Sequence, residues 1–177
     1  LPRATQDLPS LLPRSPAGET KSVDGRDKPG HDNNEQLRYR MPAYTFRRMT
    51  AADLPLLAQW LATPDWLRWW GEPEAELANL AADLHEQAMR LWIVAHDDID
   101  FAFLQDYDIH ALPNHPYRDM PPGSRGLDQS IGVAEMIGQG HGSAFIRQHT
   151  DALLKDGAPC IVTDPHPENA RAIRAYE

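Results

Sequence analysis

A loop with three alternating glycines constrains the fold of this chain more than any other segment. Gly138, Gly140 and Gly142 follow an apolar run and directly precede an amphipathic run that extends to about Lys155. Glycine is used where the backbone turns sharply or approaches a ligand closely. Successive N–H groups at a helix start attract phosphate. The segment therefore predicts a strand, a tight turn and a helix, either as a phosphate-binding loop or as a turn without a ligand.

Two common phosphate-binding motifs do not match this loop. A P-loop needs a lysine after its last glycine, and none follows Gly142. The dinucleotide fingerprint needs a third glycine where Ser143 stands, although Asp164 lies roughly 20 residues on, as a ribose-binding acid would. That fingerprint also opens the first unit of a doubly wound sheet, whereas several expected strands precede this loop. Neither motif explains the glycines.

Hydrophobic periodicity predicts a mixed α/β chain in the order β-α-α-β-β-β-α-β-α. Strands are expected at 44–48, 90–95, 99–110, 127–133 and 159–163. Helices are expected from 50 to about 61, over 74–89, from the glycine loop to about 155, and from 167 onward.

Side-chain spacing predicts which faces these elements bury. In the strand 99–110, alternation places Ile99, Phe101, Phe103 and Tyr107 on one face and aspartates 100, 106 and 108 on the other. The inward residues expected on the helix after the glycine loop are Phe145, Ile146, Ala152 and Leu153. Cys160 is expected in a buried strand as a core residue.

Composition separates the first 40 residues from the rest. Residues 1–40 contain five prolines and no aromatic residue before Tyr39, so they cannot bury enough apolar surface to become ordered. The first methionine is Met41. We expect a disordered leader or a mis-translated upstream segment over 1–40, followed by one domain over 41–177.

The charge and cysteine content narrow the classes of partner. Residues 41–177 carry 10 basic and 20 acidic residues, a net charge of −10. Such a domain repels nucleic acid and favours cationic partners, although solubility alone also explains the charge. The sequence shows no membrane-spanning run and no signal peptide, and its one cysteine suits a reducing compartment. We expect a cytoplasmic protein that binds neither nucleic acid nor membrane.

Two separated segments resemble the GCN5-related N-acetyltransferase (GNAT) superfamily. The first is Ile137-Gly-Gln-Gly140-His-Gly142, which is similar to the family's acyl-CoA loop, with Ile137 where the family has Arg or Gln. The second runs from Thr163 to Glu177 and contains Asn169 and Tyr176, which helical spacing puts on one face. The resemblance covers about residues 43–177. It implies the acyl-CoA N-acyltransferase fold, a central and mostly antiparallel sheet flanked by helices, with the last strands missing from this sequence.

The same resemblance implies a donor site for acetyl-CoA as co-substrate, with no metal. The residues that would form it are Val133, Ala134, Ile137, Gly138, Gln139, Gly140, His141, Gly142, Ser143 and Asn169. A backbone N–H near 132–134 would receive the oxyanion. Tyr176 would lie beside the sulfur and protonate the departing thiolate as general acid.

Within the superfamily, three segments are most similar to the aminoglycoside 6'-N-acetyltransferases. These are Arg68-Trp-Trp-Gly71, Phe103-Leu-Gln-Asp-Tyr107 and Arg125-Gly-Leu-Asp-Gln-Ser130. The likeness implies that Asp128 lies beside the reacting amine as its base and binding partner. Gln105 and Tyr107 would line the acceptor cleft. Trp69 and Trp70 would stack on substrate sugars, or belong to the core, as tryptophans at helical spacing often do.

Other acceptors and roles stay open on the sequence alone. A second acceptor-binding acid, which those enzymes carry before Arg125, has no clear counterpart here. A siderophore-type hydroxylamine, a protein or peptide amine, and a non-catalytic acyl-CoA-binding domain are the alternatives. His110 and His115 match no zinc spacing and are expected in a solvated loop.

Overall fold

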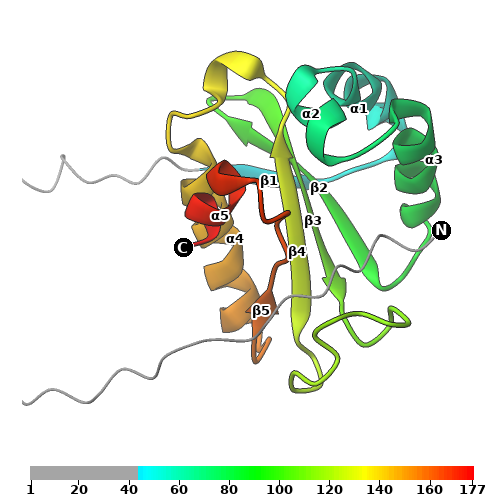
Figure 1. Ribbon diagram of the computed structural model, residues 1–177, viewed down its shortest axis with the longest axis vertical. Coiled ribbons are helices and arrows are strands. Elements are labelled where there is room, and N and C mark those ends of the chain that lie inside the picture. The colour runs from blue at the N-terminus through cyan, green and yellow to red at the C-terminus, as the bar shows by residue number, and fades with distance from the viewer. Residues whose placement is uncertain (1–43) are drawn as a thin grey trace, which may run out of the picture. The chain divides into compact units, whose positions relative to one another are not determined.

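The computed structural model describes residues 44–177, so the expectation of a leader over 1–40 lies outside the described residues. The strands are β1 (Thr45–Arg48), β2 (Met89–His96), β3 (Ile99–Asp108), β4 (Arg125–Ile131) and β5 (Ile161–Val162) (Figure 1). The helices are α1 (Leu54–Leu61), α2 (Pro64–Trp69), α3 (Pro73–Asp83), α4 (His141–Lys155) and α5 (Ala170–Tyr176). Short 3₁₀ turns, η1 (Ala51–Asp53) and η2 (Ala134–Met136), precede α1 and the glycine loop.

The strands form one mixed sheet in the order β1-β2-β3-β4-β5. The first four strands pair antiparallel, and β5 pairs parallel with β4. The predicted mixed, mostly antiparallel sheet is therefore confirmed. Pairing between β4 and β5 is limited to Arg125–Gly126 and Ile161–Val162, whereas β4 continues to Ile131. β4 and the edge strand β5 are consequently not paired over the second half of β4, which leaves a wedge beside the glycine loop.

Helices cover both faces of the sheet. Figure 1 shows α4 and α5 on one side and α1, α2 and α3 on the other. Two buried clusters match these layers, and we name them by their helices. The α1–α3 face includes Leu57, Trp66, Leu80, Phe103 and Tyr107. The α4 face includes Val94, Phe101, Leu104, Leu127 and Phe145.

A β-bulge at Phe101 corrects the predicted faces of β3. Ala102 pairs with Val94 and Asp100 with Ala95, so Phe101 is the extra residue between two successive pairs. A bulge reverses the alternation beyond it. Phe101 therefore packs on the α4 face, opposite Phe103, and the prediction that the two share a face is wrong.

Several predicted boundaries also move. The helix expected over 74–89 ends at Asp83, because Leu84 to Ala88 form turns and Met89 already begins β2. The tryptophan segment forms a helix of its own, α2, and both α2 and α3 begin with proline, which suits the first helical position.

The predicted inward face of α4 is wrong at one residue, because Ala152 is exposed. His149, one turn after Phe145, is buried instead. The strand expected at 159–163 is only Ile161–Val162 and is partly buried, with Cys160 just before it.

The buried Asp106 carboxylate joins four elements on the α4 face. Oδ1 accepts hydrogen bonds from Arg90 Nε of β2 at 2.7 Å and Arg125 Nε of β4 at 2.6 Å. Oδ2 accepts from Trp92 Nε1 at 2.8 Å and contacts His149 Nε2 of α4 at 2.9 Å. Burial alone would raise the pKa of Asp106, but these partners lower it to about 2.

We predict that Asp106→Asn lowers the free energy of unfolding by about 3–5 kcal/mol, because two arginines would lose their buried counter-charge. Urea unfolding followed by circular dichroism measures this change. Asp151→Asn on the exposed side of α4 is the matched control and should stay within about 0.5 kcal/mol of wild type.

The same pair of proteins tests the pH dependence. The pKa of Asp106 is about 2 in the folded chain and about 3.9 in the unfolded chain. The contribution of the ionised Asp106 to the free energy of unfolding is therefore complete above about pH 4 and is lost as the pH falls toward 2. The stability difference between wild type and Asp106→Asn should shrink over that interval. A difference that is already small at pH 7 would contradict the assignment.

Candidate functional site

A cavity of about 330 Å³ lies in the wedge beside β4. It is bounded by β4, the glycine loop, α2 and α5. The sequence-predicted residues that line it are Trp69, Trp70, Ile137, Gly138, Gly140, Gly142, Ser143 and Asn169. Arg171 and Arg174 of α5 add two positive charges to its wall.

The glycine loop keeps its backbone open to this cavity. Gly138 and Gly140 have φ angles of +78° and +86°, in the left-handed region that strongly favours glycine. No heavy atom lies within 4 Å of where a Cβ would stand on either residue. Gly140 is the N-cap of α4, so the first turn of this 15-residue helix begins at the cavity. N–H groups at such a helix start are suited to an anion.

Several residues predicted for the donor site do not line the cavity. The His141 side chain points to the start of β1, where its Nδ1 lies 2.8 Å from the Tyr44 hydroxyl. The Gln139 side chain donates to the backbone carbonyl of Glu135. The N–H groups of Gly132 and Val133 both donate to the Phe101 carbonyl. These two N–H groups are therefore already hydrogen-bonded, and of residues 132–134 only the Ala134 N–H makes no bond to Phe101.

Asn169 has a structural contact as well as a place on the cavity wall. Its side-chain oxygen accepts a hydrogen bond from the Ala172 N–H at 3.0 Å and so caps α5. Loss of an N-cap of this kind costs a helix roughly 1 kcal/mol. Asn169 therefore fixes the start of the helix that ends with Tyr176.

The acceptor residues predicted from the sequence meet on the α1–α3 face of β3 and β4. Gln105 and Asp128 are partners in the ladder, and Gln105 Nε2 donates to Asp128 Oδ2 at 2.7 Å. Gln105 is fully buried, so this bond holds the carboxylate in one orientation. Tyr107 faces Gly126, where a Cβ would lie only 2.2 Å from the ring. The tyrosine ring thus covers Gly126, two residues before Asp128 on β4.

Tyr176, the last residue of α5, lies near two carboxylates. Burial raises the pKa of its phenol, and the negative charge of Asp128 and, to a smaller degree, of Asp164 raises it further. Contacts with the side chains of Thr163 and Gln129 lower the pKa in part. The phenol is consequently protonated at neutral pH, and Asp128 and Tyr176 are close enough to interact electrostatically.

The tryptophans of α2 and of its C-cap lie partly in the core and partly on the cavity wall. Trp66 is fully buried and stacks on Trp70, with ring centroids 4.9 Å apart, so Trp70 belongs both to the core and to the cavity wall. Trp69 lies under the Arg68 guanidinium and 5.6 Å from the His166 ring.

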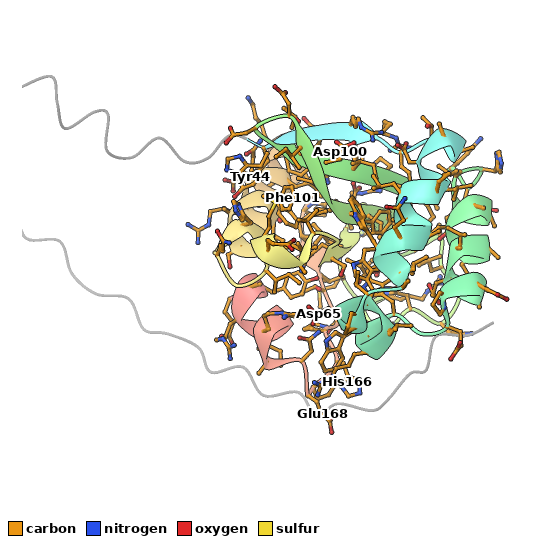
Figure 2. All side chains as sticks on the ribbon, turned by 90° about the horizontal axis from the view of Figure 1, so that it is seen from above. Tyr44, Asp65, Asp100, Phe101, His166 and Glu168 are labelled. Atoms are coloured by element: carbon orange, nitrogen blue, oxygen red, sulfur yellow. The ribbon has the colours of Figure 1, made fainter. Side chains whose placement is uncertain are left out.

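An ion pair between Asp65 and Arg171, with atoms 2.8 Å apart, joins α2 to α5 beside these rings. Figure 2 shows Asp65 and His166 at the same end of the molecule.

Sequence reasoning missed the loop between β3 and β4 as part of the acceptor side. His115 was expected in a solvated loop, but its ring is half-buried, 5.7 Å from Tyr107 and 5.9 Å from Tyr117. The Tyr117 hydroxyl donates to the Thr163 carbonyl at 3.4 Å. The aromatic spacing of His115 and Tyr117 was the available signal, because solvated loops rarely concentrate rings.

Residues 44–177 contain neither a metal-binding cluster nor a membrane-spanning helix. No group of three or more His, Cys, Asp or Glu side chains is arranged to hold a metal ion there. No helix in this part of the chain is long and apolar enough to cross a bilayer.

Comparison with known proteins adds relatives to this geometry. A family model described as an acetyltransferase (GNAT) domain matches residues 49–177. Aminoglycoside N(6')-acetyltransferase type 1 from Klebsiella pneumoniae is 32% identical over 142 residues, which cover 75% of this chain and 71% of the relative. A kanamycin resistance protein from Rhizobium radiobacter is 46% identical over 57 residues, covering 32% of this chain and 53% of that protein.

Solved structures of the same kind superpose on the fold. Aminoglycoside acetyltransferase AAC(6')-Ib in complex with coenzyme A and kanamycin matches with a TM-score of 0.67 and 30% identity, over 76% of this chain and 81% of that one. AAC(6')-Ib with paromomycin and acetyl-CoA matches with a TM-score of 0.68 and 28% identity, over 76% and 80% of the two chains. This chain belongs to the GNAT family of acetyltransferases.

Proposed function

We propose that this protein transfers the acetyl group of acetyl-CoA to a primary amine of an aminoglycoside. The observation that carries the proposal is the carboxylate of Asp128, which Gln105 holds and which acts electrostatically on Tyr176. Asp128 directly precedes the residues of β4, 129–131, that line the cavity together with the glycine loop. The relatives named as aminoglycoside N(6')-acetyltransferases support this acceptor class.

The residues of the cavity fit the donor. Acetyl-CoA supplies the acetyl group as a thioester, together with a pyrophosphate that needs several N–H donors. The backbone at Gly138, Gly140 and the first turn of α4 would hold the pyrophosphate, since nothing covers these glycines. Arg174 on the cavity wall would supply positive charge for the phosphates, beside Arg171, which is paired with Asp65. The Ala134 N–H is our proposed donor to the oxyanion.

Asp128 would bind and deprotonate the acceptor. An aliphatic amine is an ammonium at neutral pH and must lose a proton before its lone pair can attack a carbonyl. Asp128, whose Oδ2 accepts a hydrogen bond from Gln105, would bind the ammonium and accept its proton directly or through a water molecule. The nitrogen then forms a bond to the thioester carbon, and the C–S bond breaks when the tetrahedral intermediate collapses.

Tyr176 would give its phenolic proton to the departing thiolate. The raised pKa keeps the phenol protonated until the thiolate forms. Part of that rise comes from the Asp128 charge, which a bound ammonium neutralises. Binding of the acceptor would therefore lower the pKa of Tyr176 and make it a better acid when it is needed. The reaction releases one proton overall, and no covalent enzyme intermediate is required.

Charge favours a polycationic acceptor over a neutral hydroxylamine. The segment 41–177 carries a net charge of −10, and the carboxylates of Asp128 and Asp164 both act on Tyr176. A neutral siderophore-type acceptor would gain little from these charges. Thiol release from acetyl-CoA, measured with kanamycin, a hydroxylamine and a lysine peptide, tests the class. Turnover with the hydroxylamine or peptide and none with aminoglycosides would overturn the proposal.

We predict that Asp128→Asn lowers kcat/KM for kanamycin by about 10²- to 10⁴-fold, because the amide can neither accept the proton nor pair with the ammonium. KM for acetyl-CoA should not change. Asp151→Asn, on the exposed side of α4, is the control and should retain wild-type rates. Equal loss of acetyl-CoA binding in Asp128→Asn would indicate a structural role.

Tyr176→Phe should lower kcat by about 10²-fold or more while KM for both substrates stays near wild type, because only the proton donor is removed. Steady-state kinetics with kanamycin, together with the thermal midpoint, measure the effect. An unchanged kcat would exclude Tyr176 as the general acid.

Two glycine variants separate backbone strain from donor binding. Gly140 and Gly157 have φ angles of +86° and +99°, and a Cβ on either would meet no atom within 4 Å. Alanine at each position should cost about 1–2 kcal/mol of stability. Only Gly140→Ala should also raise KM for acetyl-CoA, because Gly157 follows α4 and does not line this cavity. An equal rise in KM in both variants would argue against the glycine loop as the donor cradle.

A further inference from the structure

An exposed ion pair lies at the edge of the cavity. Arg171 Nη2 of α5 donates to Asp65 Oδ1 of α2 at 2.8 Å. Arg171 lines the cavity and Asp65 does not, so the carboxylate stands at the rim. In Figure 1, α5 lies with α4 on one side of the sheet, and α2 lies with α1 and α3 on the other. The ion pair therefore joins the two helical layers beside the cavity.

A second contact links the same two segments without using the ion pair. The ring of Trp69 on α2 lies 5.6 Å from the ring of His166, which precedes α5. Trp69 follows Asp65 by four residues, so both side chains lie on the same side of α2. Trp69 also lines the cavity. The ion pair can consequently open while the ring contact keeps α2 beside the segment before α5.

The exposure of the two charged side chains makes their ion pair weak. The Arg171 side chain is 48% exposed and the Asp65 side chain 37% exposed. Water and salt screen such a pair, so that the bonded arrangement is favoured over the separated one by only about two- to fivefold. A ligand that pairs well with either charge can therefore separate them.

Each of the two charges suits one of the proposed substrates. The planar guanidinium of Arg171 on the cavity wall can donate two hydrogen bonds to a phosphate of the donor. Asp65 stands one turn from the cavity-lining Trp69 and can pair with an ammonium. A polycationic acceptor carries several ammonium groups, and Asp128 would bind only the one that reacts. A second carboxylate is thus useful to this acceptor once Arg171 has left it.

We propose that Arg171 changes partner from Asp65 to a donor phosphate when acetyl-CoA binds, and that the released Asp65 binds a second ammonium of the polycationic acceptor. This inference rests on the proposed function. Donor binding then completes the acceptor site through one ion pair. By linkage, an acceptor that occupies Asp65 frees Arg171 and strengthens donor binding by the same factor.

The exchange of partners has a defined thermodynamic signature. Whichever ligand binds first must open the ion pair, whereas the second ligand finds it already open. The affinity of a ligand is reduced by the fraction of protein in the binding-competent state. Coenzyme A should therefore strengthen kanamycin binding about three- to sixfold through this pair, given the weak preference for the bonded arrangement.

Titration calorimetry at fixed ionic strength measures this coupling. Coenzyme A replaces acetyl-CoA because it has no acetyl group to transfer, and the Kd of kanamycin is measured without it and at saturation. Asp65→Asn should bind coenzyme A about three- to sixfold more tightly and kanamycin more weakly. Arg171→Gln should bind coenzyme A more weakly and kanamycin alone about three- to sixfold more tightly. In both variants, the enhancement by coenzyme A should fall by that same factor.

Two control variants separate this exchange from a general loss of charge. Asp100→Asn removes a carboxylate that is 34% exposed and pairs with Arg47 at 2.6 Å. Figure 2 shows Asp100 on the opposite side of the molecule from Asp65. Glu168→Gln removes an exposed carboxylate at the same end as Asp65, but one that is not bonded to Arg171. Both controls should keep the wild-type coupling between coenzyme A and kanamycin.

The outcomes separate this inference from the proposed function. If wild type acetylates kanamycin and Asp65→Asn and Arg171→Gln keep the wild-type coupling, the exchange is overturned and the proposed function stands. If Asp65→Asn binds coenzyme A more weakly, the ion pair only holds α5 in place, which also overturns the exchange. If wild type acetylates no aminoglycoside, the proposed function fails and the inference fails with it.

Discussion

A single buried charge joins the sheet to α4, within the apolar contacts of the α4 face. Asp106 accepts hydrogen bonds from side chains of β2 and β4 and contacts a histidine of α4. These partners lower the pKa of Asp106 to about 2. A carboxylate with no solvent contact is tolerated only when such partners surround it. α4 is also the helix whose first turn begins at the glycine loop. The orientation of the donor cradle is thus tied to the middle of β3 through one side chain.

Consecutive residues of β3 serve different purposes because they face opposite layers. Asp106 points to α4 and holds the scaffold, whereas Gln105 and Tyr107 point to the α1–α3 face and shape the acceptor side. The same division applies to β4, where Leu127 is core on the α4 face and Asp128 is paired with Gln105. Because side chains alternate along a strand, one segment can contribute stabilising residues to one face and acceptor-site residues to the other.

The amino-acid sequence predicted the sheet type, most elements and the glycine loop, because periodicity and turn residues act locally. It placed Gln105 and Asp128 on one cleft only through a family resemblance, since register between strands is not visible in one sequence. It missed the burial of Asp106, because aspartates that alternate with apolar residues along a strand are expected to face solvent. It also missed His115, whose position depends on a loop folding back onto Tyr107.

The bulge at Phe101 separates the tip of the β2–β3 hairpin from the rest of β3. Beyond it, Ala102 to Asp108 pair continuously with β4, and this stretch contains Gln105 and Tyr107. The Phe101 carbonyl itself receives the N–H groups of Gly132 and Val133, where the chain leaves β4 for the glycine loop. Changes in length at the tip, 96–100, would be absorbed at the bulge and would leave the register of the acceptor side intact. The hairpin tip can therefore vary in sequence and length while Gln105 and Tyr107, further along the same strand, keep their positions.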